Sequence, residues 1–212
     1  AHRVIELLYE AGMPRDVVQL LPGDGPTVGS VLTSDPRITG VVFTGGTDTA
    51  QIINRALAAR DNAPLPTLIA ETGGMNAMIV DSTALPEQVV VDVIQSAFQS
   101  AGQRCSALRV LYLQEDVADR VIEILKGAMS ELRIGDPRDL GTDVGPVIDE
   151  DARKGLMEHI EKLKGENRLV AETPMAAEHT QHGTFVPPVA FTIDSIDALT
   201  REQFGPVLHI VR

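Results

Sequence analysis

The sequence predicts an α/β fold in which helices cover a mostly parallel β-sheet. Strand-like apolar runs alternate with helix-like segments along most of the 212 residues, the order typical of parallel strands connected by helices. Glycine-rich loops follow several of the strands, as expected of strand-to-helix turns. Hydrophobic residues make up 43% of the chain, which is enough for a sizeable core.

The first third of the chain predicts three strands, two helices and a short helical stretch. It opens on an amphipathic helix with Val4, Leu7, Leu8 and Ala11 on one face, and Gly12 ends that helix. The elements expected next are a strand over residues 17–21, a short helical stretch after the loop GDGPTVG, a strand over 38–43, a helix over 49–61 and a strand over 66–71.

The segment TGGMN then separates a second block, so we expect a boundary between residues 1–72 and 73–212. In the helix expected over residues 86–102, Pro86 fits the first turn and Gly102 the end. The buried face of that helix should comprise Val89, Val90, Val93, Ile94, Ala97 and Phe98. The other expected elements are strands over 76–80 and 107–114, helices over 116–129 and 149–164, several short strands, and a final strand over 206–212.

Composition excludes several classes of partner. Thirty acidic and eighteen basic residues give a net charge of −12, which repels nucleic acid and anionic membrane surfaces. The apolar runs are shorter than a membrane span, and no signal-peptide pattern opens the chain. A single cysteine cannot close an intrachain disulfide, so we expect a reducing, cytoplasmic compartment.

That cysteine, Cys105, lies in the stretch SAGQRCSAL. A lone Cys is most often a small buried hydrophobe, and this alternative stands beside a nucleophilic role. The loops GDGPTVG and FTGGTDTA each follow a strand and precede a helix, where backbone N–H groups can bind a phosphate. Taken alone, such a loop is more often a plain turn between a strand and a helix. No metal site is expected, because the histidine pair in HTQH has no further ligand at suitable spacing.

Four segments occur in one order: FTGGTDTA, ETGGMNAMIV, GQRCSA and EQFGPV. Together they closely resemble the signature segments of the aldehyde dehydrogenase superfamily, including the 34 residues from Glu71 to Cys105. The resemblance covers essentially the whole chain and implies an aldehyde dehydrogenase-like fold. Residues 1–72 would be the C-terminal part of a Rossmann-type NAD-binding domain, and residues 73–212 an incomplete catalytic domain that carries the thiol. We therefore expect the chain to be an excerpt from a longer protein.

The resemblance implies that Cys105 is the nucleophile of an NAD-dependent aldehyde dehydrogenase. A thiolate that attacks an aldehyde gives a thiohemiacetal, hydride transfer to the nicotinamide leaves a thioester, and water hydrolyses the thioester. Glu71 matches the general base of the family, and its place after the apolar run PTLIA predicts partial burial. Arg104 invites a role in favouring the thiolate, but adjacent residues of an extended segment point in opposite directions, so a surface role is equally open.

The same resemblance implies which residues bind NAD. Gly45 and Gly46 would lie near the pyrophosphate, Gly25 and Gly29 near the adenosine end, Thr72 and Gly73 near the nicotinamide, and Glu202 would hold the nicotinamide ribose with Phe204 packed nearby. The chain departs from the family pattern twice, because Gly46 stands in place of a serine and Ala50 in place of a glycine. Without the motif, Glu202 beside Arg201 would be a plain surface pair.

The segments around these motifs resemble the L-glutamate γ-semialdehyde (1-pyrroline-5-carboxylate) dehydrogenase branch of the family. Within that branch, they resemble the dehydrogenase domain of bacterial bifunctional proline utilization A proteins. This implies a small aldehyde substrate with a carboxylate, which Ser106 would help to bind; the alternative for Ser106 is a loop hydroxyl bonded to its own backbone. Two other functions remain open: a dehydrogenase for another small aldehyde, and a binding fragment without turnover.

The resemblance also implies properties of the longer protein. We expect it to be a homo-oligomer, and a fused proline dehydrogenase domain is compatible with the branch. In the family, an asparagine of the oxyanion hole and a lysine on the adenosine ribose come from upstream segments, so we expect residues 1–212 alone to be inactive.

Overall fold

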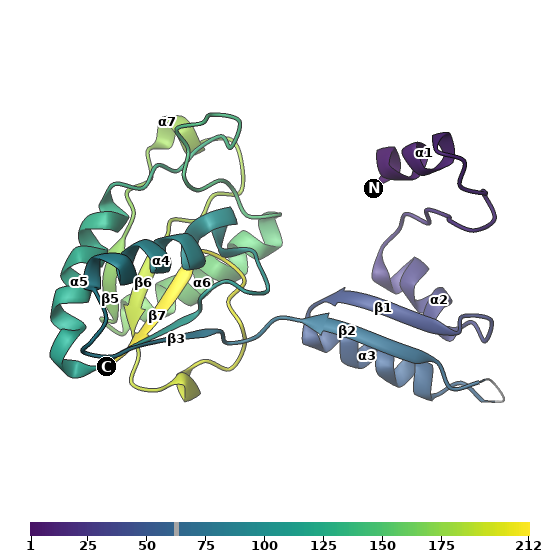
Figure 1. The fold of residues 1–212 in the computed structure, drawn as a ribbon, viewed down its shortest axis with the longest axis horizontal. Helices are drawn as coiled ribbons and strands as arrows, with labels where there is room; N and C mark the ends of the chain where they lie inside the picture. The colour runs from purple at the N-terminus through teal and green to yellow at the C-terminus, as the bar shows by residue number, and fades with distance from the viewer. Residues whose placement is uncertain (62–63) are drawn as a thin grey trace. The chain divides into compact units, whose positions relative to one another are not determined.

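A computed structural model describes residues 1–61 and 64–212, which divide into two units, Ala1–Thr72 and Gly73–Arg212. Each unit contains its own β-sheet with helices packed against it, so both have the predicted α/β architecture (Figure 1). The five-stranded sheet of the second unit is mostly parallel, as expected.

A parallel pair of strands and the helix between them form the centre of the first unit. Strand β1 (Gly40–Gly45) pairs with β2 (Thr67–Thr72), and α3 (Thr47–Ala58) contacts both strands. This helix buries Ala50 and Leu57, one helical face, toward the strands. Ahead of this centre come α1 (His2–Glu10), η1 (Gly25–Gly29) and α2 (Ser30–Ser34).

Helix α1 ends where the sequence predicted, but its apolar face is not buried. Gly12 has a φ of +94°, and its N–H donates to the Tyr9 carbonyl, so a left-handed residue ends the helix. None of the residues of α1 is buried, and the side chains of Val4 and Leu7 are exposed in this unit.

The predicted strand over residues 17–21 is wrong. These residues are irregular and join no sheet of the described chain; Val17 is 65% exposed and Leu21 58% exposed. A short apolar run forms a strand only where a neighbouring strand supplies hydrogen-bond partners, and here the Val18 carbonyl accepts from the Tyr9 hydroxyl instead.

The sheet of the second unit has the strand order β3-β4-β7-β6-β5, and only β5 runs antiparallel to its neighbour. Its strands are β3 (Ala77–Val80), β4 (Val110–Leu113), β5 (Leu169–Glu172), β6 (Val189–Thr192) and β7 (Val207–Val211). Every residue of β7 is buried, as is typical of a central strand covered on both faces.

Helices cover both faces of this sheet. Helix α4 (Pro86–Phe98) lies in front of β6 and β7 and packs against α5 (Glu115–Ser130), whereas α6 (Glu150–Gly165) lies behind the sheet (Figure 1). The predicted α5 and α6 are confirmed to within one residue at each end. The buried face of α4 comprises Val89, Val90, Val93, Ala97 and Phe98, all predicted, while Ile94 is half-buried. Shorter pieces are η2 (Gln99–Gly102), α7 (Ala177–Thr180) and η3 (Ile196–Ala198).

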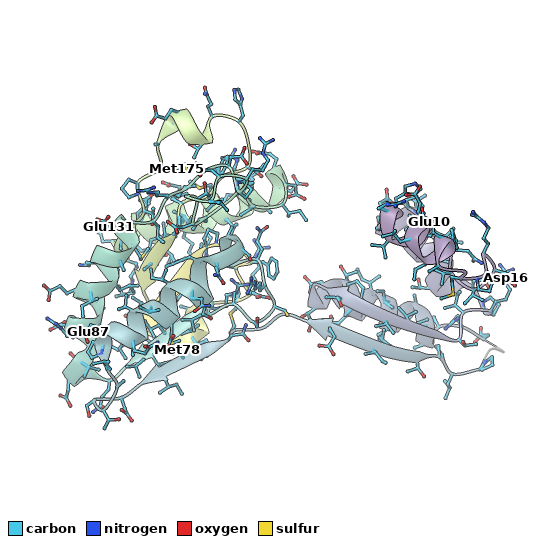
Figure 2. All side chains as sticks on the ribbon, turned by 45° about the horizontal axis from the view of Figure 1, so that its top comes forward. Glu10, Asp16, Met78, Glu87, Glu131 and Met175 are labelled. Atoms are coloured by element: carbon cyan, nitrogen blue, oxygen red, sulfur yellow. The ribbon has the colours of Figure 1, made fainter. Side chains whose placement is uncertain are left out.

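The acidic composition appears on the surface of both units. In Figure 2 the side chains of Glu10 and Asp16 project from the first unit, and those of Glu87 and Glu131 project from the second. No helix among residues 1–61 and 64–212 combines the length and the apolar character that a bilayer crossing requires.

Candidate active site

A left-handed turn precedes Cys105. Helix α4 ends at Phe98, and Ser100, Ala101 and Gly102 then take φ values of 55°, 53° and 65°. Non-glycine residues persist in this region only where their surroundings hold them, and such strain is often found at functional sites. A Cβ on Gly102 would lie 2.2 Å from the Gly205 carbonyl oxygen, so the turn also requires a residue without a side chain here.

Cys105 itself is an exposed free thiol. The alternative that it is a buried core residue is therefore wrong, although Ala107 and Leu108, two and three positions later, are buried. Among the described residues, no acceptor is found for the backbone N–H of Cys105. An exposed thiol beside an unpaired N–H can attack a carbonyl carbon and donate a hydrogen bond to the oxyanion that forms.

Asn76 holds the backbone of this segment. Its side-chain Nδ2 donates to the carbonyl oxygens of Cys105 at 2.7 Å and Ala107 at 2.9 Å. Its own carbonyl accepts from the backbone N–H groups of Arg109 and Val110. These hydrogen bonds tie the backbone that carries the thiol to Asn76, the residue before β3.

Two neighbours of Cys105 act on the turn. The Gln103 side chain donates to the Pro146 carbonyl at 3.3 Å and accepts from the Ile148 N–H at 2.8 Å, which fastens the turn to a loop. Arg104 is exposed and donates from Nε to the Ser100 hydroxyl at 3.2 Å. These contacts favour the surface role for Arg104.

Glu202 is paired with Arg109, not with Arg201. Its Oε1 accepts from Arg109 Nε at 3.0 Å and Nη2 at 2.9 Å, and the Glu202 side chain is 19% exposed. Burial lowers the pKa of Arg109, and the hydrogen bonds and charge of Glu202 act in the opposite direction. The Phe204 ring centroid lies 5.2 Å from Arg109 Cζ, so three residues form one cluster.

The structure brings Gly73 next to this carboxylate. A Cβ on Gly73 would lie 1.7 Å from Glu202 Oε2, so only glycine leaves room for the observed carboxylate. Within the part of the chain that the structure describes, Oε2 accepts no hydrogen bond. A half-buried carboxylate with one anchored and one open oxygen fits the hydroxyl groups of a ribose.

In the first unit, four predicted residues meet at the carboxyl ends of β1 and β2. Gly45 pairs in register with Thr72, and Thr44 with Glu71, while Gly46 is the N-terminal capping residue of α3. No side chain caps α3, so its first N–H groups can bind an anion. Glu71 is exposed, so the predicted partial burial is wrong within this unit: β2 pairs on one side only, with β1.

Gly25 and Gly29 lie on a different segment, the helical turn η1, rather than in an open loop. The Asp24 carboxylate caps this turn by accepting from the Thr27 N–H at 2.7 Å, and hydrogen bonds from the Thr27 side chain and backbone lower the pKa of Asp24. A carboxylate therefore already occupies the position that a phosphate would take at η1.

Ser106 is exposed, and its hydroxyl makes no hydrogen bond with any residue that the structure describes. The alternative of a hydroxyl bonded to its own backbone is therefore not found. No three or more His, Cys, Asp or Glu side chains of residues 1–61 and 64–212 lie together in an arrangement that could hold a metal ion.

Arg109 and Asn76 were not predicted from the sequence. The signal for Arg109 was an arginine inside the apolar run ALRVLYL, since a charged residue in a strand buried on both faces needs a buried partner. Asn76 had no comparable signal, because its two hydrogen bonds reach residues 29 and 31 positions away.

Comparisons with known proteins agree with these features. The chain matches the aldehyde dehydrogenase family over residues 1–212. It is 56% identical over 214 residues to the bifunctional protein PutA of Klebsiella aerogenes, covering 98% of this chain and 16% of that protein. It is 36% identical over 216 residues to the 1-pyrroline-5-carboxylate dehydrogenase of Geobacillus kaustophilus, covering 100% of this chain and 41% of that enzyme.

A solved structure supports the fold. The betaine aldehyde dehydrogenase of Staphylococcus aureus, in complex with NAD⁺, has a TM-score of 0.91 and 27% identity, over 98% of this chain and 41% of that chain. The 212 residues thus span less than half of each of these relatives. The match along its full length and these similarities show that the chain belongs to the aldehyde dehydrogenase family.

Proposed function

We propose that the chain is part of an NAD-dependent enzyme that oxidises L-glutamate γ-semialdehyde to L-glutamate. In the balanced reaction, the aldehyde, NAD⁺ and water give the carboxylate, NADH and two protons. Residues 1–72 would bind NAD and residues 73–212 would carry the reacting thiol.

The observation that carries this proposal is the exposure of Cys105 on a fixed backbone. Its Sγ would attack the aldehyde carbon to form a thiohemiacetal, and the unpaired Cys105 N–H would donate to the oxygen. Loss of a hydride from this adduct to NAD⁺ would leave a thioester. Glu71 would then accept a proton from the water that hydrolyses the thioester, which releases the thiol. Ser106 would donate to the substrate carboxylate, since its hydroxyl is exposed and makes no hydrogen bond with any residue that the structure describes.

Bound NAD⁺ supplies the hydride acceptor. Glu202, through its open Oε2, would bind the nicotinamide ribose, with Gly73, Thr72 and Phe204 nearby. Gly45 and Gly46 would bind the pyrophosphate at the start of α3, and Gly25 and Gly29 would lie toward the adenosine end. The capped η1 turn favours neutral contacts there, because Asp24 repels a phosphate.

The substrate assignment is supported by the relatives. The curated relatives named above are a bifunctional PutA and a 1-pyrroline-5-carboxylate dehydrogenase, and the bifunctional relative supports a fused proline dehydrogenase domain. We extend the proposal to a homo-oligomer of the full-length protein. The free thiol is compatible with a reducing, cytoplasmic compartment. The experiments below test this proposal against two alternatives. The substrate could be another small aldehyde, or the chain could be a binding fragment without turnover.

The test is NADH formation from L-glutamate γ-semialdehyde by the full-length protein. Cys105→Ala should abolish it. Glu71→Gln should retain a first turnover and slow steady turnover by about a hundredfold or more, because hydrolysis loses its base. Glu131→Gln, an exposed acid at the end of α5, is the matched control and should leave the rate unchanged.

The substrate is tested with a second pair of variants. Ser106→Ala should raise KM for the semialdehyde more than for an aldehyde without a carboxylate, whereas Ser82→Ala, also exposed, should change neither. A full-length protein that prefers uncharged aldehydes would contradict the substrate, and an active Cys105→Ala variant would contradict the mechanism. We expect residues 1–212 alone to give no turnover.

A further inference from the structure

The guanidinium of Arg109 is buried and uses every donor it has. The residue is 1% exposed, and a guanidinium carries five N–H groups in a fixed planar fork. Nε and Nη2 donate to Glu202 Oε1 at 3.0 and 2.9 Å, and Nη2 also donates to the Arg104 carbonyl at 3.1 Å. Nη1 donates to the carbonyls of Gly102 at 2.7 Å and Gly205 at 3.2 Å.

These acceptors belong to two segments that lie far apart in the sequence. Gly102 and Arg104 form the turn immediately before Cys105, and Glu202 and Gly205 lie just before β7. The two segments also touch directly, as the crowding of Gly102 against the Gly205 carbonyl shows. Arg109 therefore joins the turn before the thiol to the carboxylate proposed for the ribose.

The bond to the Arg104 carbonyl has a specific geometric consequence. The Arg104 C=O and the Cys105 N–H belong to one peptide group, which is planar, and every peptide bond of the described chain is trans. The N–H of a trans peptide points away from its C=O. Holding the carbonyl on Arg109 therefore directs the Cys105 N–H away from the guanidinium, and Asn76 holds the next carbonyl, that of Cys105.

We propose that Arg109 is a positioning residue that orients the Cys105 backbone N–H toward the oxyanion of the thiol adduct, and that it anchors Glu202 with the same guanidinium. This inference rests on the proposed function, because it assigns a partner to the thiol chemistry of Cys105. Arg109 touches neither substrate nor thiol in this scheme. Lysine cannot replace it, since an ammonium has three donors and no planar fork.

Two reactions of the Cys105 thiol distinguish a positioning role of Arg109 from a general structural role. Alkylation by iodoacetamide forms a sulfur–carbon bond with loss of iodide and creates no oxyanion. Acylation by p-nitrophenyl acetate passes through a tetrahedral oxyanion before p-nitrophenolate leaves, and neither reaction needs a cofactor. Both rates are measured on the full-length protein by mass spectrometry of the peptide that contains Cys105.

The informative variant is Arg109→Met combined with Glu202→Gln, compared with Glu202→Gln alone. Removing both charges avoids an unpaired buried ion, so the double variant should fold. We expect its acylation to be slower than that of Glu202→Gln by about tenfold or more, as for a misplaced oxyanion donor, with alkylation unchanged to within about threefold. Arg109→Lys should show the same selective loss.

The control is the matched exposed pair, Arg120→Met with Glu87→Gln, which are 3.2 Å apart and exposed on both sides. Its ratio of acylation to alkylation should equal that of the unaltered protein. If the Arg109→Met, Glu202→Gln variant had the same ratio of acylation to alkylation as Glu202→Gln alone, the inference would be overturned. Equal losses in the rates of both reactions would overturn it as well. If the unaltered protein acylates Cys105 but oxidises no aldehyde, the proposed function fails while the inference about Arg109 stands.

Discussion

Replacing Gly102 by alanine should destabilise the second unit, because this residue meets two separate restrictions. Its φ of 65° is left-handed, which costs a residue with a Cβ about 1–2 kcal/mol. The added Cβ would also lie 2.2 Å from the Gly205 carbonyl oxygen and 2.9 Å from that of Ala97. These are backbone atoms, so relieving the overlap requires a shift of the chain, typically about 1–3 kcal/mol.

Together these effects predict a loss of about 2–5 kcal/mol for Gly102→Ala. Since each 1.4 kcal/mol is about a factor of ten in an equilibrium constant, backbone hydrogen exchange in peptides covering residues 86–102 and 203–211 should be faster by well over tenfold. The assay is hydrogen exchange by mass spectrometry on the full-length protein, with thermal unfolding alongside it.

The matched control is Gly127→Ala, in which the same atom is added to an exposed position inside α5. No atom lies within 4 Å of a Cβ there, and alanine favours a helix over glycine by about 0.5–1 kcal/mol. This variant should be slightly more stable than the unaltered protein. If Gly102→Ala were as stable as Gly127→Ala, the account of the turn before Cys105 would be refuted.

Two further predictions concern pH and the cofactor. His209 Nδ1 donates to the Arg109 carbonyl at 3.2 Å, and His209 Nε2 lies 2.9 Å from His159 Nε2. Burial is the main cause that lowers the pKa of His209 from 6.5 to about 4, and the charge of His159 adds to it. As the pH falls, the unfolded chain therefore binds a proton before the folded protein does. The free energy of unfolding is highest above pH 6.5 and decreases toward pH 4, by about 2 kcal/mol between pH 7 and pH 5. His209→Asn keeps a hydrogen-bond donor, and urea unfolding of this variant should show no such difference between the two pH values. Gly46→Ser should tighten NAD binding about fivefold by equilibrium dialysis, because its Cβ meets no atom within 4 Å and a hydroxyl adds a hydrogen bond of about 1 kcal/mol; unchanged affinity would argue against pyrophosphate at this position.

The regular elements were predictable because their signals are local. The helical spacing of Val89, Val93 and Ala97 and the start at Pro86 predicted α4 from the sequence alone. The predicted end at Gly102 is wrong, because α4 stops at Phe98 and a left-handed turn follows. The failure at residues 17–21 has the opposite cause, because a strand depends on a partner that no local pattern reveals. The exposure of Glu71 was missed for the same reason, since burial depends on what packs against β2.

The candidate site divides in the same way. Cys105, Glu71 and the glycines stand in short motifs whose order can be read along the chain. Arg109 could not be placed, because its bonds to Glu202 and Gly205 span 93 and 96 positions. Its neighbour Glu202 was predicted as a cofactor ligand, yet the cation that anchors it was not.

The strain before Cys105 and the buried charge of Arg109 explain one another. Three consecutive left-handed residues would relax in an isolated chain, and a buried guanidinium would be unstable without several acceptors. The turn supplies carbonyls that converge on Arg109, those of Gly102 and Arg104, and Arg109 in return holds the turn in its strained form. A sulfur exposed to solvent can therefore stand on a rigid backbone without entering the core. This combination suits a nucleophile that must be reachable by substrate and fixed relative to an oxyanion donor.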